Sequence, residues 1–200
     1  MNVQRTFLIA AAVLVFAFVP SAQATMANAV PNPGFEEFVC GSSTVPDICA
    51  WHAGYGSIIR RDPLKPHSGN ASLALVGFWG AAEAISDPAF CMPIGPGKHA
   101  ASYWYRTGDA SFVGFSVRFW TERKCTGSGS SSELGEYPLT LENQWHAVAG
   151  KVVAPPGTAS VSFGLEIWTA CDACSVVSAD FDDLMLETEP LPALTAETER

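Results

Sequence analysis

Acidic residues lie in two short segments that are far apart in the sequence. Asn32–Glu36 reads Asn-Pro-Gly-Phe-Glu and follows an apolar N-terminal segment, and Asp180–Glu187 lies near the end of the chain. Because the ends of a compact domain often lie close together, we expect these carboxylates to approach one another. Neighbouring carboxylates repel unless a hard cation such as calcium takes their oxygens as ligands. The two segments therefore predict a structural metal site.

A second kind of chemistry comes from side chains that alternate along β-rich segments. In 111–121 and in 160–168 every second residue is apolar, so the residues between them point to the opposite face of the strand. In 102–106 the alternation is less clear, but its Trp and Arg can join the same face. The sequence thus predicts one surface of aromatic and charged side chains, formed by Trp104, Arg106, Arg118, Trp120, Glu166 and Trp168.

Such a surface suits a sugar. A pyranose ring presents apolar C–H groups that an indole ring can cover, and hydroxyl groups that Arg or Glu can hydrogen-bond. One covered ring contributes only about 2.5 kcal/mol for ~100 Å² of apolar surface. Weak binding through several subsites is therefore expected. The alternative is that these tryptophans pack beneath loops and bind nothing.

Trp79 belongs to a second candidate surface, among loops rich in glycine. The segment Gly77–Gly80 places Phe78 and Trp79 between two glycines, where the backbone can turn sharply. Trp79 is then either an exposed ligand contact or a plug that closes the core. Trp51, by contrast, is expected in the core.

The sequence contains no recognisable catalytic motif. It lacks a G-x-S-x-G nucleophile elbow, an H-E-x-x-H metal pair and a phosphate-binding glycine loop. Glycoside hydrolysis requires two carboxylates about 5–9 Å apart in a cleft, and the acidic residues lie mainly at expected strand ends and in loops. These observations favour a binding protein over an enzyme.

The elements that position these residues are short strands separated by turns, with hardly any helical pattern. We expect about eight strands, which indicates an all-β, antiparallel β-sandwich or jelly roll. The segment 126–136, rich in Gly and Ser, is expected to be a mobile surface loop. The strands are expected at 57–60, 72–76, 81–86, 99–106, 111–121, 145–153, 160–168 and 179–187.

The chain ends predict export. Residues 1–24 have the charge, apolar run and small-x-small motif of a signal peptide cleaved after Ala24. We expect one jelly-roll domain over 25–188, a disordered tail over 189–200, a secreted or periplasmic location and a monomer, with no membrane span in the mature chain. The net charge of −9 argues against nucleic acid as a partner.

All six cysteines follow the predicted signal peptide, which indicates three disulfides formed outside the cytoplasm. Nearness in sequence favours two local pairs and leaves a third. Cys171 and Cys174 also match a redox motif, but strand-like sequence on both sides disfavours that interpretation. The expected pairs are Cys40 with Cys49, Cys91 with Cys125, and Cys171 with Cys174.

Several of these segments occur in an order that resembles secreted carbohydrate-binding modules of the galactose-binding-like jelly-roll type, in particular the cellulose-binding type. The resemblance covers most of the mature chain. The segments are 32–36, Trp51, 67–73, 102–106, Trp145–His146, 154–157 and 181–183.

The resemblance implies a structural calcium held by an N-terminal acidic residue, the turn before the third strand and an aspartate of the last strand. In this sequence those positions are Glu36, Ser68 or Asn70, and Asp182 or Asp183. In the last strand, alternation places Asp182 with Leu184 and Leu186 on one face and Phe181 with Asp183 on the other, so it does not choose between the aspartates. The alternative is that these acidic residues are only solvated strand ends.

The sequence therefore predicts a secreted, non-catalytic module that binds carbohydrate through an aromatic and charged sheet face, with a structural calcium and three disulfides. The ligand-binding residues are the six of that face together with Trp79. An alternative is an adhesion or envelope-associated domain whose aromatic face meets an extracellular protein. A small hydrolase or lyase is a third, less favoured interpretation.

Overall fold

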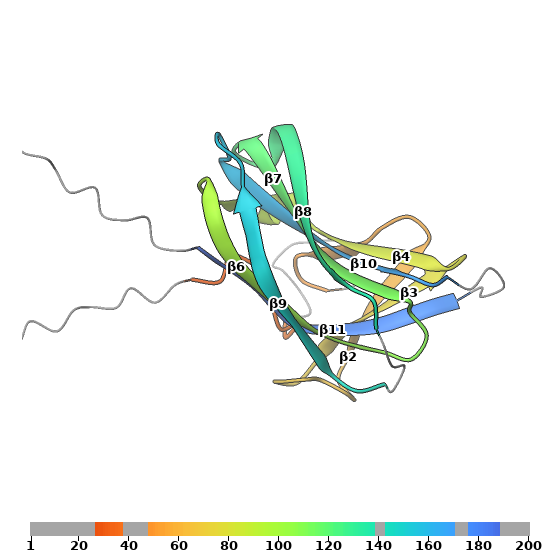
Figure 1. The fold of residues 1–200 in the computed structure, drawn as a ribbon. Coiled ribbons are helices and arrows are strands. Elements are labelled where there is room, and N and C mark those ends of the chain that lie inside the picture. Colours follow the sequence, from red (N-terminus) through yellow and green to blue (C-terminus); the bar gives the residue numbers. More distant parts are fainter. Residues whose placement is uncertain (1–26, 38–47, 139–142, 171–175, 189–200) are drawn as a thin grey trace, which may run out of the picture.

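Two antiparallel β-sheets lie face to face in the computed structural model, which describes residues 27–37, 48–138, 143–170 and 176–188 (Figure 1). The described residues contain no α-helix. Their 3-10 helix, η1 (Pro88–Phe90), has three residues, and no helix among them is long and apolar enough to cross a membrane. The elements are β1 (Trp51–Ala53), β2 (Ser57–Asp62), β3 (Ser72–Phe78), β4 (Ala81–Ser86), η1 (Pro88–Phe90), β5 (Met92–Pro93), β6 (Gly97–Thr107), β7 (Phe112–Glu122), β8 (Thr126–Glu136), β9 (His146–Ala154), β10 (Ser160–Trp168) and β11 (Val176–Thr188).

Within each sheet, many neighbouring strands are far apart in the sequence. Sheet I has the order β1-β4-β10-β7-β8, with β5 paired to β10, and sheet II has the order β2-β3-β11-β6-β9. The chain crosses between the sheets repeatedly, as in a jelly roll. The prediction of an all-β sandwich is confirmed.

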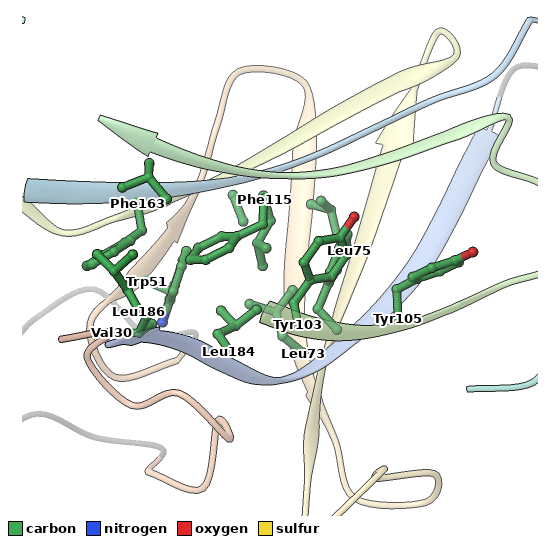
Figure 2. Packing of buried hydrophobic residues seen from close by; sticks show 14 of the residues in the cluster. Val30, Trp51, Leu73, Leu75, Tyr103, Tyr105, Phe115, Phe163, Leu184 and Leu186 are labelled. Atoms are coloured by element: carbon green, nitrogen blue, oxygen red, sulfur yellow. The ribbon is translucent and has the colours of Figure 1, made fainter. Parts of the chain in front are cut away.

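The core lies between the sheets because alternate residues of each strand are large and apolar. In β7 the inward row is Val113, Phe115, Val117 and Phe119, and each is almost completely buried. Tyr103 of β6 lies across from this row and contacts Phe115 at a ring-centroid distance of 6.1 Å. Figure 2 shows this packing, with Phe115 and Phe163 from sheet I lying above side chains of sheet II.

The eight predicted strands are all present, with ends that differ by no more than a few residues. Trp51, predicted in the core, is buried, and its Nε1 donates a hydrogen bond to the carbonyl oxygen of Pro31 at 3.1 Å. The short strands β1 and β5 were not predicted. Each has at most three residues, too few to show an alternating pattern.

The prediction that 126–136 is a loop is wrong, because this segment forms the eleven-residue strand β8 at the edge of sheet I. Its glycines make room for rings of β7. A Cβ atom at Gly129 would lie 3.1 Å from Cζ3 of Trp120, and one at Gly135 would lie 2.6 Å from Cζ of Phe112. The composition that weakens β propensity is thus what lets these aromatic rings lie over the strand.

The prediction that side chains alternate strictly between two faces of the last strand is also wrong, because β11 contains a β-bulge. Asp182 pairs with Trp104 and Met185 pairs with Ser102, so two residues of β11 oppose one residue of β6. Asp183 has a positive φ of 48° at this point. As a result Phe181 and Leu184, predicted on opposite faces, are both buried.

One of the three predicted disulfides lies wholly within the described residues. Cys91 and Cys125 are bonded, with a Cα–Cα distance of 5.7 Å, and join the segment before β5 to the turn between β7 and β8. Cys49 is also disulfide-bonded, but its predicted partner Cys40 lies outside the described residues. Cys171, Cys174, residues 1–24 and residues 189–200 lie outside them as well, so those expectations stay predictions.

The Cys91–Cys125 bond is expected to stabilise the domain by limiting the unfolded chain. It closes a loop with a sequence separation of 34, and loops of this size contribute about 2–4 kcal/mol. The double variant Cys91→Ser/Cys125→Ser should lose that amount in urea unfolding, with Ser130→Ala on exposed β8 as the control. A double variant with the wild-type unfolding midpoint would contradict this role.

Candidate functional site

The outer face of sheet I carries most of the predicted ligand-binding residues, and the register of β7 against β10 places them in rows. Phe112 pairs with Trp168, Gly114 with Glu166, Arg118 with Ser162 and Trp120 with Ser160. Because the inward rows of both strands are apolar, these residues face outward together. The predicted grouping of Arg118, Trp120, Glu166 and Trp168 on one sheet face is therefore found.

A charged cluster occupies the middle of this face. Arg118 forms a salt bridge to Glu83 of β4, and its Nη2 lies 3.9 Å from Oε1 of Glu166. Glu133 of β8 reaches over β7, since a Cβ atom at Gly114 would lie 2.5 Å from its Oε1. One cation thus stands among three carboxylates, which gives the middle of the face a net negative charge.

Burial raises the pKa of the Glu166 carboxyl, and the neighbouring carboxylates of Glu133 and Glu83 raise it further. The Arg118 guanidinium opposes this shift but does not cancel it. The ionised form of Glu166 therefore destabilises the folded state. A ligand hydroxyl that donates a hydrogen bond to this carboxylate would reduce that cost.

An aromatic cluster lies at one end of the same face. The rings of Trp168 and Phe112 are stacked with centroids 5.4 Å apart and planes inclined by 17°, and Tyr137 contacts both edge-on. Trp168 is 36% exposed and Tyr137 is 64% exposed. The alternative that this tryptophan is covered by loops does not hold among the described residues.

A pocket of about 290 Å³ adjoins this cluster. It is lined by Trp168, Tyr55, Glu83 and Glu166, with Ala81, Ala82 and Ile167 as its remaining residues. Small residues in β4 form its floor, while Tyr55 comes from the turn between β1 and β2. The pocket therefore places carboxylate oxygens beside an exposed indole.

Trp120 lies on the other side of the charged cluster, and its orientation is fixed. Its Nε1 donates a hydrogen bond to Oγ of Ser162 at 2.9 Å, and its ring lies over Gly129. The side chain is partly exposed. Indoles thus flank the charged centre of the face on both sides.

Trp104 and Arg106 do not belong to this face, so the prediction of one surface with all six residues is wrong. Both lie on β6, which is part of sheet II, and they face away from sheet I. Trp104 is stacked with His67 at 3.7 Å, and Arg106 forms a salt bridge to Asp180. Alternation defines the two faces of a strand, but it does not say to which sheet the strand belongs.

Trp79 lies in the β3–β4 turn and is 79% exposed, so the interpretation as a plug over the core is wrong. Its ring packs beside the β1–β2 turn, where a Cβ atom at Gly56 would lie 3.2 Å from its Cζ3. Tyr55, next to Gly56, lines the pocket beside Trp168. Trp79 is therefore near the aromatic end of sheet I without lining the pocket.

Four residues of this face were missed by sequence reasoning, and one of them, Glu133, lies in the segment that was predicted to be a loop. Glu83 lies in the segment Ala-Ala-Glu-Ala-Ile-Ser, where it is the one charged residue, and that was the available signal. Tyr137 follows the segment taken for a loop, so no strand direction was assigned to it. Phe112 stood among outward positions in the β7 pattern but was not connected to a ligand.

The residues predicted to hold a metal do come together where β11 bulges. Glu36 Oε1 accepts a hydrogen bond from the backbone N–H of Asn70 at 2.7 Å, and Asp183 Oδ1 accepts one from Ser68 Oγ at 2.7 Å. Asp182 is fully buried, and its Oδ2 accepts backbone hydrogen bonds from His67 and Ser68. The predicted convergence of the two acidic segments is confirmed, although hydrogen bonds occupy many of their oxygens.

Burial raises the pKa of Asp182 to about 6, and the charge of Asp183 contributes in the same direction. Gly34 is adjacent to the cluster: a Cβ atom there would lie 3.7 Å from Asp182 Oδ1 and 3.8 Å from Asp183 Oδ1. Within the described residues, no group of three or more His, Cys, Asp or Glu side chains has the arrangement of a metal centre. A cation here would need backbone or hydroxyl oxygens as additional ligands.

No family model matches the chain, and no curated protein matches its sequence. Among solved structures, the CBM22-2 xylan-binding domain of Paenibacillus barcinonensis Xyn10C superposes with a TM-score of 0.54 at 12% identity, covering 72% of this chain and 94% of that domain. The chain has the jelly-roll fold of carbohydrate-binding modules.

Longer chains contain the same fold as one part. The CBM22-1–GH10 modules of Clostridium thermocellum xylanase 10B, solved with xylohexaose, give a TM-score of 0.53 at 14% identity over 70% of this chain and 26% of that one. MgGH51 α-L-arabinofuranosidase gives 0.54 at 17% identity over 81% of this chain and 26% of that one. At these identities the likeness to the modules establishes the fold alone.

The raised pKa of Glu166 predicts a pH-dependent stability. The Glu166 carboxyl binds a proton more tightly in the folded state than in the unfolded chain. Its unfavourable contribution to the free energy of unfolding is therefore absent below the pKa of the unfolded chain, and it grows as the pH rises through the folded-state pKa. Glu166→Gln should therefore gain more stability relative to wild type at pH 7 than at pH 4 in urea unfolding. Glu122→Gln, at an exposed position, is the control. An equal effect at the two pH values would contradict the prediction.

Proposed function

We propose that the protein is a secreted, monomeric and non-catalytic module that binds a polysaccharide on the outer face of sheet I. The observation that carries the proposal is the exposed Trp168 ring, stacked on Phe112 and adjoining a pocket whose other wall is carboxylate. An apolar ring beside charged hydrogen-bonding groups matches the two kinds of surface on a pyranose. The CBM22-2 xylan-binding domain and the xylanase 10B modules solved with xylohexaose have the same fold, which is consistent with this role.

The charge of the face favours a neutral sugar. Glu83, Glu133 and Glu166 outnumber Arg118, so a carboxylated or sulfated ligand would meet net repulsion. Hydroxyl groups can donate to the carboxylates and accept from the guanidinium without adding charge. We therefore propose neutral polysaccharides, with xylan as the first to test.

Trp168 and Trp120 would serve as two stacking positions on either side of the charged cluster. Trp168 is held by the Phe112 and Tyr137 rings, and Trp120 by its hydrogen bond to Ser162. Because these contacts fix the indoles before a ligand arrives, little side-chain freedom is lost on binding. The short open pocket and partly exposed rings agree with weak affinity per sugar unit.

The test is the binding of xylohexaose and of insoluble xylan to wild type, Trp168→Ala and Trp120→Ala. Removal of one stacked ring should weaken binding by about tenfold or more. Trp104→Ala, on the outer face of sheet II, is the matched control and should bind as wild type does. A panel of other neutral glycans is included because the sugar is not fixed by the charge. If neither variant weakens any glycan that binds wild type, this face is not the site.

A protein partner is the second candidate function, and it has its own observation. Tyr55, Phe78, Trp79 and Val176 are exposed at the end of the sandwich where the β1–β2 and β3–β4 turns lie. An adhesion partner would use this apolar end in place of the sheet face. Trp79→Ala should then reduce retention on the partner, whereas Trp120→Ala should not.

We also propose a structural calcium where β11 bulges, with Glu36, Asp182 and Asp183 as carboxylate ligands and Ser68 and Asn70 as neutral oxygen ligands. The proposal is supported by the Asp182 and Asp183 carboxylate oxygens beside Gly34 and by the buried charge of Asp182, for which the described residues supply no salt-bridge partner. Calcium favours such mixed oxygen ligands. Its role here would be to join the N-terminal segment to β11.

Thermal unfolding with calcium and with chelator tests this site. For a dissociation constant of about 0.1–1 mM, as in extracellular modules, 10 mM calcium should stabilise the protein by roughly 1.5–3 kcal/mol. Asp182→Asn should abolish the calcium-dependent shift, and Glu122→Gln should keep it. Magnesium at equal ionic strength controls for screening. A midpoint that does not change with calcium would count against the metal.

A further inference from the structure

A second pocket, of about 380 Å³, lies on the outer face of sheet II, away from the proposed sugar-binding face. Its position follows from one row of paired residues across four strands. Arg60 of β2 pairs with Ala74 of β3, Ala74 pairs with Asp180 of β11, and Asp180 pairs with Arg106 of β6. The small side chain of Ala74 leaves a low floor between the taller charged neighbours. This volume lies in the range of small-ligand pockets, which begins at about 300 Å³.

Three of the charged groups in this pocket are already held by other groups. Arg106 is buried, forms a salt bridge to Asp180 and lies 5.0 Å from the centroid of the Trp145 ring. Asp109 accepts hydrogen bonds from the backbone N–H and the hydroxyl of Ser178, the former at 2.8 Å. These contacts fix the floor and one wall of the pocket without a ligand.

The other two cations are available. Arg60 and Lys65 line the pocket but make no salt bridge or side-chain hydrogen bond with any described residue. Two carboxylates of the pocket can compete for them: Asp62, which accepts a hydrogen bond from the backbone N–H of Leu64 at 2.8 Å, and Asp180, whose pKa the charge of Lys65 acts to lower. The pocket therefore offers a guanidinium and an ammonium group to an anion, beside an Asp180 carboxylate that is already paired with Arg106.

The remaining lining groups recognise hydroxyls. Asn143 offers an amide that has no hydrogen-bond partner among the described residues, and Asp109 retains free lone pairs on its carboxylate. Ala74 and Val76 form an apolar floor. The pocket thus combines an anion-binding side, a hydroxyl-binding side and a small apolar base.

We propose that this pocket binds a hexuronate unit of an acidic polysaccharide, with the sugar carboxylate at Arg60 and Lys65 and the ring hydroxyls at Asp109 and Asn143. The choice of a sugar among hydroxylated anions rests on the proposed function. The choice of an acidic sugar rests on this pocket alone, because its three cations and three carboxylates leave it formally neutral, whereas the outer face of sheet I is net negative. The domain then has two sites that separate neutral from acidic sugars.

Titration calorimetry with trigalacturonate and with neutral galactotriose tests the proposal, in wild type, Arg60→Gln and Lys65→Gln. Each substitution should weaken trigalacturonate binding by about tenfold or more, since a charge-assisted hydrogen bond is lost. Arg123→Gln, which removes an exposed cation at the β7–β8 turn, is the matched control and should bind as wild type does. Added salt should weaken trigalacturonate binding to wild type. Thermal unfolding of each variant verifies that it is folded.

The variants of sheet I separate this proposal from the proposed function. Trp168→Ala should weaken xylohexaose binding and leave trigalacturonate binding unchanged, and Arg60→Gln should do the reverse. If trigalacturonate does not bind wild type, binds both cation variants as tightly as wild type, or is lost with Trp168→Ala, the second site is wrong. If trigalacturonate binds through Arg60 while no neutral glycan binds at all, the second site stands and the proposed function of sheet I fails.

Discussion

The antiparallel register between β7 and β10 is the constraint on which both the core and the outer face of sheet I depend. Phe115 pairs with Leu165 and Val117 with Phe163, so the inward positions of the two strands meet as apolar pairs. A slip by one residue would bury Arg118 and expose this row, which the hydrophobic effect forbids. The same register therefore brings Trp168 against Phe112 and Arg118 between the glutamates.

Much of this arrangement could be predicted because it is local to single strands. The alternation in β7 and β10 is long and regular, and it gave the correct outward residues without any knowledge of partners. Trp104 was assigned to the wrong surface because the face of a strand is a local property and its place in a sheet is not. The β11 bulge was hidden for a similar reason: the extra residue at Asp183 is defined only by its pairing with β6.

The Gly/Ser-rich β8 was predicted to be a loop because its composition is unusual for a strand. Its small residues leave room for aromatic rings of β7. Gly129 and Gly135 have poor β propensity, yet a Cβ atom at Gly135 would collide with the Phe112 ring and one at Gly129 would crowd the Trp120 ring. Only the positions of rings on the adjacent strand explain why glycine occurs there. Glu83 and Glu133 escaped prediction on the same ground, since they reach the site from other strands of the sheet.

The two outer faces point in opposite directions, and the sheets between them are packed about 10 Å apart. Two ligands bound at once could not belong to the same short oligosaccharide, because the body of the domain separates them. One copy would instead be bivalent and could cross-link a neutral strand to an acidic strand within a mixed polymer network. Retention on such a network would then exceed the affinity of either face through effective concentration.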